Sequence, residues 1–206
     1  MTFPGIDLLL HELAEKGWVA VSNIFPSNLI EALAQECLQL QSEGALQAAA
    51  IGVEKKPQLN HHIRGDSTYW LEEKSLSPDQ TIFFDYLKEL QEQLNRAFYI
   101  GIQRVESHFA IYPPTARYAK HMDTPPGQQN RKITFVLYLN RQWQKSHGGQ
   151  LSLFKPEDGE ELLTQIEPQF GNFVLFRSDL FPHQVELCGC DRLSLTGWFR
   201  SDGDLL

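Results

Sequence analysis

The residues best suited to chemistry in this sequence are two histidines and an aspartate in its second half. His121 and Asp123 flank Met122, just after a run of strand-forming residues. In an extended segment, residues two apart point to the same side, so an imidazole and a carboxylate can bind one ion together. His183, at the start of a later apolar run, can supply a third ligand. Such a set leaves three coordination positions open, which favours octahedral iron(II) with room for a bidentate keto acid and O2.

A basic residue downstream indicates that an anion binds near this metal site. Arg192 follows His183 in the next run of strand-forming residues. A buried guanidinium is costly unless it meets an anion, and its planar fork suits a carboxylate. Thr196 has the same strand parity as Arg192 and can join that contact. A five-carbon keto diacid, 2-oxoglutarate, would satisfy the metal at one end and Arg192 at the other.

The strands that would position these residues are predicted from about residue 100 onward. Short runs of β-branched and aromatic residues alternate there with Gly, Pro, Asn or Asp. Because no helix is predicted between them, such strands form an antiparallel sandwich or barrel. The six runs are VESHFAIY, KITFVLYLN, GQLSLF, GNFVLF, HQVEL and RLSLTGWF.

The first part of the chain has the periodicity of helices. Apolar spacing predicts helices over residues 6–16 and from 27 to about 41, with a strand over 18–25 between them. Ser77 and Gln80 predict a capping box that begins a third helix, whose apolar residues then recur at three- and four-residue steps.

The order of these elements predicts the fold class. Residues 44–76 are expected to be irregular. We expect an α+β chain with a mainly β core, namely a double-stranded β-helix (jelly roll) with packed N-terminal helices. The expected division is a helical support region at 1–98, packed on the core, and a catalytic domain at 99–201.

Composition excludes some classes of function. The net charge of -8 and the pI near 5.3 argue against nucleic-acid or anionic-membrane binding, since phosphates require a basic surface. The N-terminus has neither the basic region of a signal peptide nor an apolar run long enough to span a membrane. Three cysteines without framework spacing, Cys37, Cys188 and Cys190, fit a reducing compartment, and no role is assigned to them. We expect a soluble, cytoplasmic monomer.

Several motifs together resemble one known family over roughly residues 60–200. They are HIRGDSTYW (62–70), YPPTARYAKHMD (112–123), ITFVLYLNRQW (133–143), GGQLSLF (148–154) and PHQVELCGCDRLSLTGWF (182–199). The chain resembles the prolyl 4-hydroxylases of the hypoxia-sensing type, in their small bacterial form. The resemblance implies hydroxylation of a protein's proline, coupled to decarboxylation of 2-oxoglutarate to succinate and CO2. It implies Fe(II), 2-oxoglutarate and O2, with ascorbate (vitamin C) as a candidate reductant.

The resemblance also assigns roles to residues. It makes His121, Asp123 and His183 the iron ligands, and Arg192 the anchor of the distal co-substrate carboxylate. Tyr138 would share that carboxylate, and Tyr112 would lie near the metal-chelating end. Five positions match residues that line the pocket: Thr134, Val136, Leu151, Thr196 and Trp198. Four match the substrate entrance: Arg64, Asp66, Trp70 and Arg131, the last as a partner of Asp66.

Alternatives to this reading remain open. The same iron chemistry could act on another residue or on a small molecule. A non-catalytic metal-binding jelly roll would tolerate replacement of Arg192, and a zinc hydrolase would need an acid/base partner that is not evident. Among proteins containing a target proline, a translation elongation factor is one candidate substrate. The remaining histidines of the core and loops are interpreted as surface residues: His61, His62, His108 and His147.

Overall fold

The computed structural model describes residues 5–49, 63–124 and 130–202, which contain two β-sheets and three α-helices. The helices are α1 (Ile6–Lys16), α2 (Ser27–Ser42) and α3 (Pro78–Phe98), with 3-10 turns at Glu73–Ser75 and Lys145–His147. The strands are β1 (Trp18–Ser22), β2 (Gln47–Ala48), β3 (Ser67–Leu71), β4 (Arg104–Tyr112), β5 (Tyr118–His121), β6 (Arg131–Tyr138), β7 (Leu151–Phe154), β8 (Leu162–Ile166), β9 (Asn172–Arg177), β10 (His183–Val185) and β11 (Arg192–Arg200).

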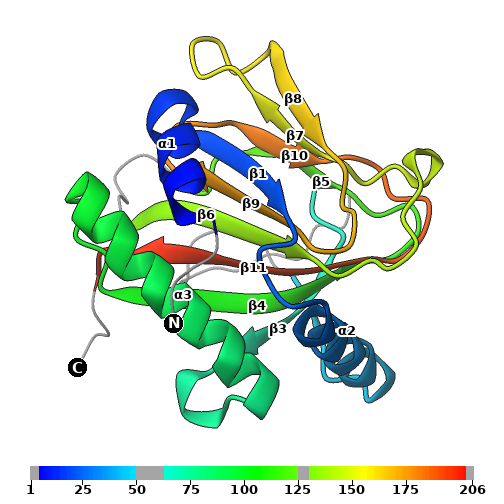
Figure 1. Ribbon diagram of the computed structural model, residues 1–206. Coiled ribbons are helices and arrows are strands. Elements are labelled where there is room, and N and C mark those ends of the chain that lie inside the picture. Colours follow the sequence, from blue (N-terminus) through cyan, green and yellow to red (C-terminus); the bar gives the residue numbers. More distant parts are fainter. Residues whose placement is uncertain (1–4, 50–62, 125–129, 203–206) are drawn as a thin grey trace.

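The strands form two antiparallel layers (Figure 1). The larger sheet has the order β1-β9-β6-β11-β4-β3-β2, and the smaller one has the order β5-β10-β7-β8. Consecutive β6 and β7 belong to different sheets, so the chain crosses between layers as a jelly roll does. The mainly β antiparallel core with N-terminal helices confirms the predicted fold class.

The three predicted helices are confirmed, and the best marked begins where the sequence indicates. The backbone N–H of Gln80 donates to Ser77 Oγ at 3.2 Å, and the backbone N–H of Ser77 donates to Gln80 Oε1 at 3.2 Å. This capping box satisfies two amides at the start of α3, which has Pro78 in its first turn. At the other end, Tyr99 takes a left-handed conformation with φ 54° and ends the helix.

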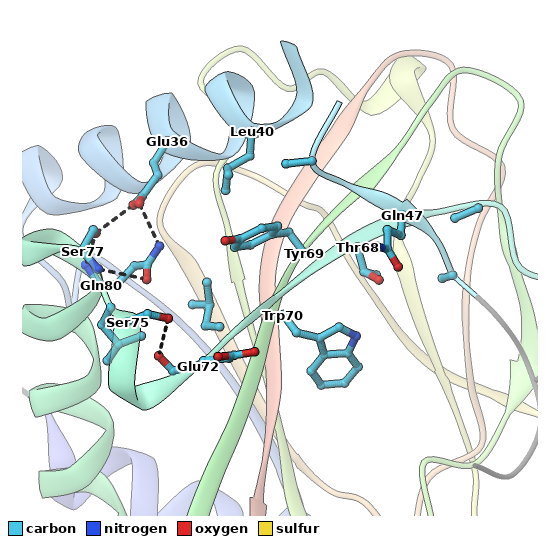
Figure 2. Close-up of a pocket in the computed structure, with 15 residues that line it drawn as sticks. Glu36, Leu40, Gln47, Thr68, Tyr69, Trp70, Glu72, Ser75, Ser77 and Gln80 are labelled. Atoms are coloured by element: carbon cyan, nitrogen blue, oxygen red, sulfur yellow. Dashed lines mark hydrogen bonds between the residues drawn. The ribbon is translucent and has the colours of Figure 1, made fainter. Parts of the chain in front are cut away.

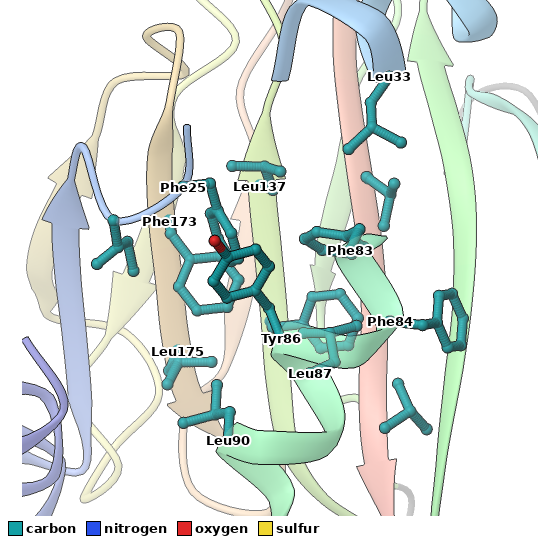
Figure 3. Close-up of a cluster of buried hydrophobic side chains, with 14 of the residues drawn as sticks. Phe25, Leu33, Phe83, Phe84, Tyr86, Leu87, Leu90, Leu137, Phe173 and Leu175 are labelled. Carbon is teal, nitrogen blue, oxygen red and sulfur yellow. The ribbon is translucent and has the colours of Figure 1, made fainter. Parts of the chain in front are cut away.

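Side chains alternate between the two faces of the larger sheet, so the faces differ. On one face, odd-numbered residues of the sheet pack against α3 and the other helices. Figure 3 shows Leu137, Phe173 and Leu175 against Phe83, Leu87 and Leu90 of α3. Fully burying one such side chain contributes about 1.5–3 kcal/mol. The helices therefore cover one face of the larger sheet, and the even-numbered residues on its other face point toward the smaller sheet.

Strands from the first half of the chain also belong to the larger sheet. β1 pairs with β9, and β3 pairs with β4 in the register Trp70↔His108. The prediction of an irregular region over residues 44–76 is therefore wrong at β3, whose strand signal is only five residues long. The division at residue 98 stays a prediction, since strands from both sides of it share one sheet. Nowhere in the described ranges is a helix long and apolar enough to cross a bilayer.

Candidate metal centre and its pocket

The structure brings the three predicted metal ligands together on the smaller sheet. His121 at the end of β5 pairs with His183 at the start of β10, and Asp123 follows two residues later. His121 Nε2 lies 3.6 Å from Asp123 Oδ1, and His183 Nε2 lies 3.5 Å from Asp123 Oδ2. One ligand atom from each residue lies within 4.8 Å of the others, which is compact enough for one metal ion.

Backbone carbonyls fix the orientation of both imidazoles. His121 Nδ1 lies 2.9 Å from the Ala119 carbonyl oxygen, and His183 Nδ1 lies 3.0 Å from that of Phe181. A carbonyl only accepts, so each Nδ1 carries the hydrogen and each Nε2 presents its lone pair to the shared centre. This is the tautomer that a metal requires, held by the second nitrogen of each ring.

The protonation states also suit a divalent cation. Burial, together with the nearby His121, lowers the pKa of His183 to about 4, so the His183 imidazole is neutral at physiological pH. Burial alone would raise the pKa of Asp123, but His183, His121 and Thr134 lower it well below its usual range. The neutral imidazole of His183 and the carboxylate of Asp123 can therefore bind a metal without first losing a proton.

A hydroxyl pair supports the carboxylate from the larger sheet. Thr134 Oγ1 donates to Asp123 Oδ2 at 2.7 Å and lies 2.8 Å from Ser178 Oγ. All three residues are buried, so the contact holds the carboxylate in a fixed orientation. Ser178 was not predicted, because its place beside Thr134 depends on the pairing of β6 with β9.

A β-bulge adds another unpredicted residue, Tyr118, to the site. In the pairing of β10 with β5, His183 lies opposite His121 and Val185 lies opposite Tyr118, so two steps on β10 match three on β5. The extra residue places Tyr118 on the same side as His121, although simple alternation predicts opposite sides. Their rings stack with centroids 3.7 Å apart and planes 16° apart. Arg64 covers the Tyr118 ring at 4.8 Å.

On the face of the larger sheet that points toward the smaller sheet, Arg192 is a buried cation with no anion beside it among the described residues. It is 2% exposed. Its Nε donates to the Gly149 carbonyl oxygen at 2.8 Å and its Nη1 lies 3.5 Å from Ser194 Oγ, both neutral acceptors. The guanidinium lies 4.9 Å from the centroid of the Tyr138 ring, whose buried hydroxyl has no hydrogen-bond partner among the described residues. A carboxylate placed here would satisfy both groups.

Gly149 has a specific part in shaping the surroundings of Arg192. Its φ is +66°, and an added Cβ would lie 3.1 Å from Arg192 Cδ and 3.0 Å from Cys188 Sγ. A side chain at this position would therefore crowd Arg192, whose Nε–H donates to the Gly149 carbonyl oxygen.

The residues expected to line the pocket lie between the metal triad and Arg192. On adjacent strands, Thr134 pairs with Trp198, Val136 with Thr196, and Tyr138 with Ser194. Leu151 on the facing sheet packs in the same buried cluster as Val136 and Tyr138. Tyr112 lies opposite Arg192 on β4, with its ring 5.1 Å from the guanidinium, and its role near the metal-chelating end stays a prediction.

The expected entrance residues come together with one changed partner. Arg64 donates from Nε and Nη2 to both oxygens of Asp66, at 2.7 and 3.0 Å. The predicted pairing of Arg131 with Asp66 is wrong, because Arg64 occupies both oxygens and Arg131 instead donates to Glu106 Oε1 at 3.2 Å. Arg131 also lies 3.5 Å over the Trp198 ring.

One of the histidines interpreted as surface residues is buried. His108 is 2% exposed and packs against Trp70 and Trp198. The interpretation failed because β4 is an inner strand, with β11 on one side and β3 on the other. His147 is partly buried, whereas His61 and His62 lie outside the described residues.

A hollow of about 650 Å³ lies between α2, β3 and the start of α3 (Figure 2). Within it, Glu36 accepts hydrogen bonds from Ser77 Oγ at 3.2 Å and Gln80 Nε2 at 2.8 Å. Burial raises the pKa of Glu36. These polar groups satisfy one another, and neither the triad nor Arg192 lines this hollow.

Comparison with known proteins gives a consistent result. The family model described as the 2OG-Fe(II) oxygenase superfamily matches residues 107–200. Prolyl hydroxylase EGLN3 of Homo sapiens is 29% identical, over 94% of this chain and 82% of that protein. A crystal structure of a Pseudomonas putida prolyl-4-hydroxylase is similar with a TM-score of 0.84 and 35% identity, covering 96% of this chain and 100% of that one. A Trichoplax adhaerens prolyl hydroxylase, solved with a hypoxia inducible factor peptide fragment, has a TM-score of 0.83 and 25% identity, over 95% of this chain and 89% of that one.

Proposed function

Because the chain belongs to the 2OG-Fe(II) oxygenase superfamily, among its prolyl hydroxylases, we propose that it hydroxylates a prolyl residue of a protein at the 4-position. The reaction consumes O2 and 2-oxoglutarate and releases succinate and CO2. When bound, iron and 2-oxoglutarate together supply the oxidising power that converts a C–H bond into C–OH. The observation that carries this proposal is Arg192, a buried cation with no anion beside it in the described part of the chain, on the face of the larger sheet that points toward the sheet carrying His121 and His183.

In this proposal His121, Asp123 and His183 hold iron(II). Their orientation fits this role, because both Nε2 atoms and the carboxylate already point to one centre. Three protein ligands leave three positions for the keto acid and O2. Thr134 keeps the carboxylate in place, and the Tyr118 ring supports the His121 plane.

Arg192 and Tyr138 bind the distal carboxylate of 2-oxoglutarate in this proposal. Burial raises the pKa of Tyr138, against the lowering effect of Arg192, so its hydroxyl stays a neutral donor. The guanidinium and the phenol then offer the carboxylate one ionic and one neutral hydrogen bond. Thr196, Val136 and Leu151 form walls that exclude water from the reaction.

The substrate would enter beside the ring of Trp70, which is 46% exposed. Arg64, Asp66 and Arg131 border this entrance, and their ion pairs hold its rim in shape. We expect a cytoplasmic monomer with ascorbate as the reductant. A translation elongation factor is the first protein to assay as substrate.

The proposal is tested with purified protein, iron(II), 2-oxoglutarate and that protein substrate. We expect hydroxyproline, identified by tandem mass spectrometry, in a one-to-one ratio with succinate. Arg192→Met should abolish both products at low 2-oxoglutarate. Succinate formed with a different hydroxylated product would move the target to another residue. If the iron-loaded protein formed its product at a rate that does not depend on 2-oxoglutarate, the oxygenase function itself would be contradicted.

A further inference from the structure

Two buried nitrogen atoms on the inner face of the larger sheet have no hydrogen-bond partner among the described residues. They are His108 Nδ1 and Trp198 Nε1, in side chains that belong to residues 2% and 6% exposed. A buried polar atom without a partner destabilises the folded state. The Tyr138 hydroxyl is in the same situation, and the co-substrate carboxylate accounts for it. The two nitrogens therefore indicate that a second molecule binds on this face.

The two nitrogens belong to one cluster of three rings. The centroid of His108 lies 4.6 Å from that of Trp70 and 5.5 Å from that of Trp198, and the two tryptophans are 6.2 Å apart. The rings come from the neighbouring strands β3, β4 and β11. Because Trp70 is 46% exposed, this ring cluster extends from the buried face to the surface.

The position of the ring cluster points to the substrate rather than the co-substrate. Thr134 and Tyr138, which contact the two ends of the proposed co-substrate pocket, lie on β6. β11 lies between β6 and β4, so His108 is on the far side of β11 from that pocket. On its other side, His108 pairs with Trp70 of β3, at the proposed substrate entrance.

The chemistry of the two nitrogens fits a peptide group. Burial and the nearby Arg64 and Arg131 lower the pKa of His108 to about 3, against the effects of Asp66 and Asp123. The imidazole is therefore neutral, with one N–H and one acceptor nitrogen, while the indole N–H of Trp198 only donates. Two neutral groups, of which the indole can only donate, match the N–H and C=O of a main chain better than they match a charged side chain.

We propose that His108 Nδ1 and Trp198 Nε1 hydrogen-bond the substrate's main chain next to the target proline, which makes His108 a substrate-binding residue. This inference rests on the proposed function, because it assumes a peptide substrate.

The test measures peptide binding without turnover. The parent and variants are loaded with iron(II) and 2-oxoglutarate under argon and titrated with the hypoxia inducible factor peptide fragment that the Trichoplax relative binds. Tryptophan fluorescence reports binding. His108→Leu and His108→Phe should each weaken peptide affinity about 5- to 100-fold, because a peptide group is left unpaired. His108→Gln, which keeps a polar group, should recover part of the loss. His11→Leu, on the exposed surface of α1, is the matched control.

Affinity for 2-oxoglutarate and thermal stability separate the remaining explanations. We expect 2-oxoglutarate affinity within about twofold of the parent in both variants, since the nitrogen faces the peptide. The ligand-free His108→Phe protein, which keeps the ring contacts, should melt no lower than the parent. Unchanged peptide affinity, a loss of 2-oxoglutarate affinity alone, or a clear fall in its melting temperature would each overturn the inference. If the parent binds iron and 2-oxoglutarate but not this peptide, the melting temperatures of the parent and of ligand-free His108→Phe still test the inference, because a clear fall in the variant would overturn it. A parent that does not bind 2-oxoglutarate would instead contradict the proposed function.

Discussion

The two faces of the larger sheet come from the same strands but have opposite properties. Along β4, β6 and β11, odd-numbered residues such as Phe109, Leu137 and Leu195 pack against the helices and are almost wholly buried. Even-numbered residues of these strands, including Tyr138 and Arg192, face the smaller sheet. One face is an apolar core with satisfied contacts, and the other keeps buried polar groups that have no partner within the described ranges.

The inner face therefore carries groups that lower the stability of the ligand-free protein. Three of the four buried side-chain atoms without a partner among the described residues lie on even-numbered positions of the inner face: His108 Nδ1, Tyr138 Oη and Trp198 Nε1. An unsatisfied buried group costs about 1–3 kcal/mol. The helix-packed face offsets this cost, so the two faces should respond differently to mutation.

The largest effect is expected on the metal side of the inner face. Asp123→Ala removes the carboxylate that both imidazoles face. Activity should fall by more than about 100-fold, because even partners outside the ligand set cost 10–100-fold. Anaerobic iron(II) titration and succinate release are the measurements. Retention of iron affinity within a few-fold of the parent would show that the triad is not the metal site.

The next largest effect is expected at Arg192. Arg192→Met should weaken 2-oxoglutarate binding by roughly 30-fold or more, since losing one partner of a buried ion pair costs about 2–5 kcal/mol. Iron affinity without 2-oxoglutarate should stay near that of the parent. Stability should not fall in proportion, because the described residues of the ligand-free protein place no anion beside the cation. A large loss of stability with normal 2-oxoglutarate affinity would make Arg192 a structural residue.

The opposite face should show the reverse pattern. Leu137→Ala removes a fully buried side chain that packs against α3. We expect the free energy of unfolding in urea to fall by about 2–5 kcal/mol. Iron and 2-oxoglutarate affinities of the folded protein should change little. If both affinities fell together with stability, the two faces would not be separable in function.

A smaller effect is expected from pH. The pKa of His108 is lowered from 6.5 to about 3, so the unfolded chain binds a proton that the folded protein does not. Stability is therefore greatest above pH 6.5 and falls as the pH falls toward 3, by about 1.4 kcal/mol for each pH unit. Urea unfolding of the metal-free protein at several pH values measures this slope. His108→Leu should make it shallower, and an unchanged slope would assign it to other groups.

The smallest effect is expected at the stacked ring beside His121. Tyr118→Leu should weaken iron(II) affinity by roughly 2- to 10-fold, because an aromatic pair contributes about 0.5–1.5 kcal/mol. Tyr118→Phe keeps the ring and should bind iron like the parent. Equal losses in the two variants would assign the effect to the hydroxyl and contradict a role for stacking.

The local elements and the chemical types of the site residues could be predicted from the sequence. The capping box at Ser77 and the apolar spacing located three helices, and strand periodicity located most of the β core. His121 and Asp123 could be paired because they are two residues apart on one strand end. Arg192 could be assigned to an anion because a buried guanidinium requires one.

Contacts between residues far apart in the chain could not be predicted and depend on how the strands pair. Tyr118 reaches His121 through a β-bulge, which shifts strand parity and leaves no signal in composition or spacing. Ser178 reaches Thr134 through strand pairing, and Arg131 meets Glu106 because Arg64 already binds Asp66. His108 is buried because two strands flank β4. Such contacts depend on the register and order of strands far apart in the chain, which local periodicity does not contain.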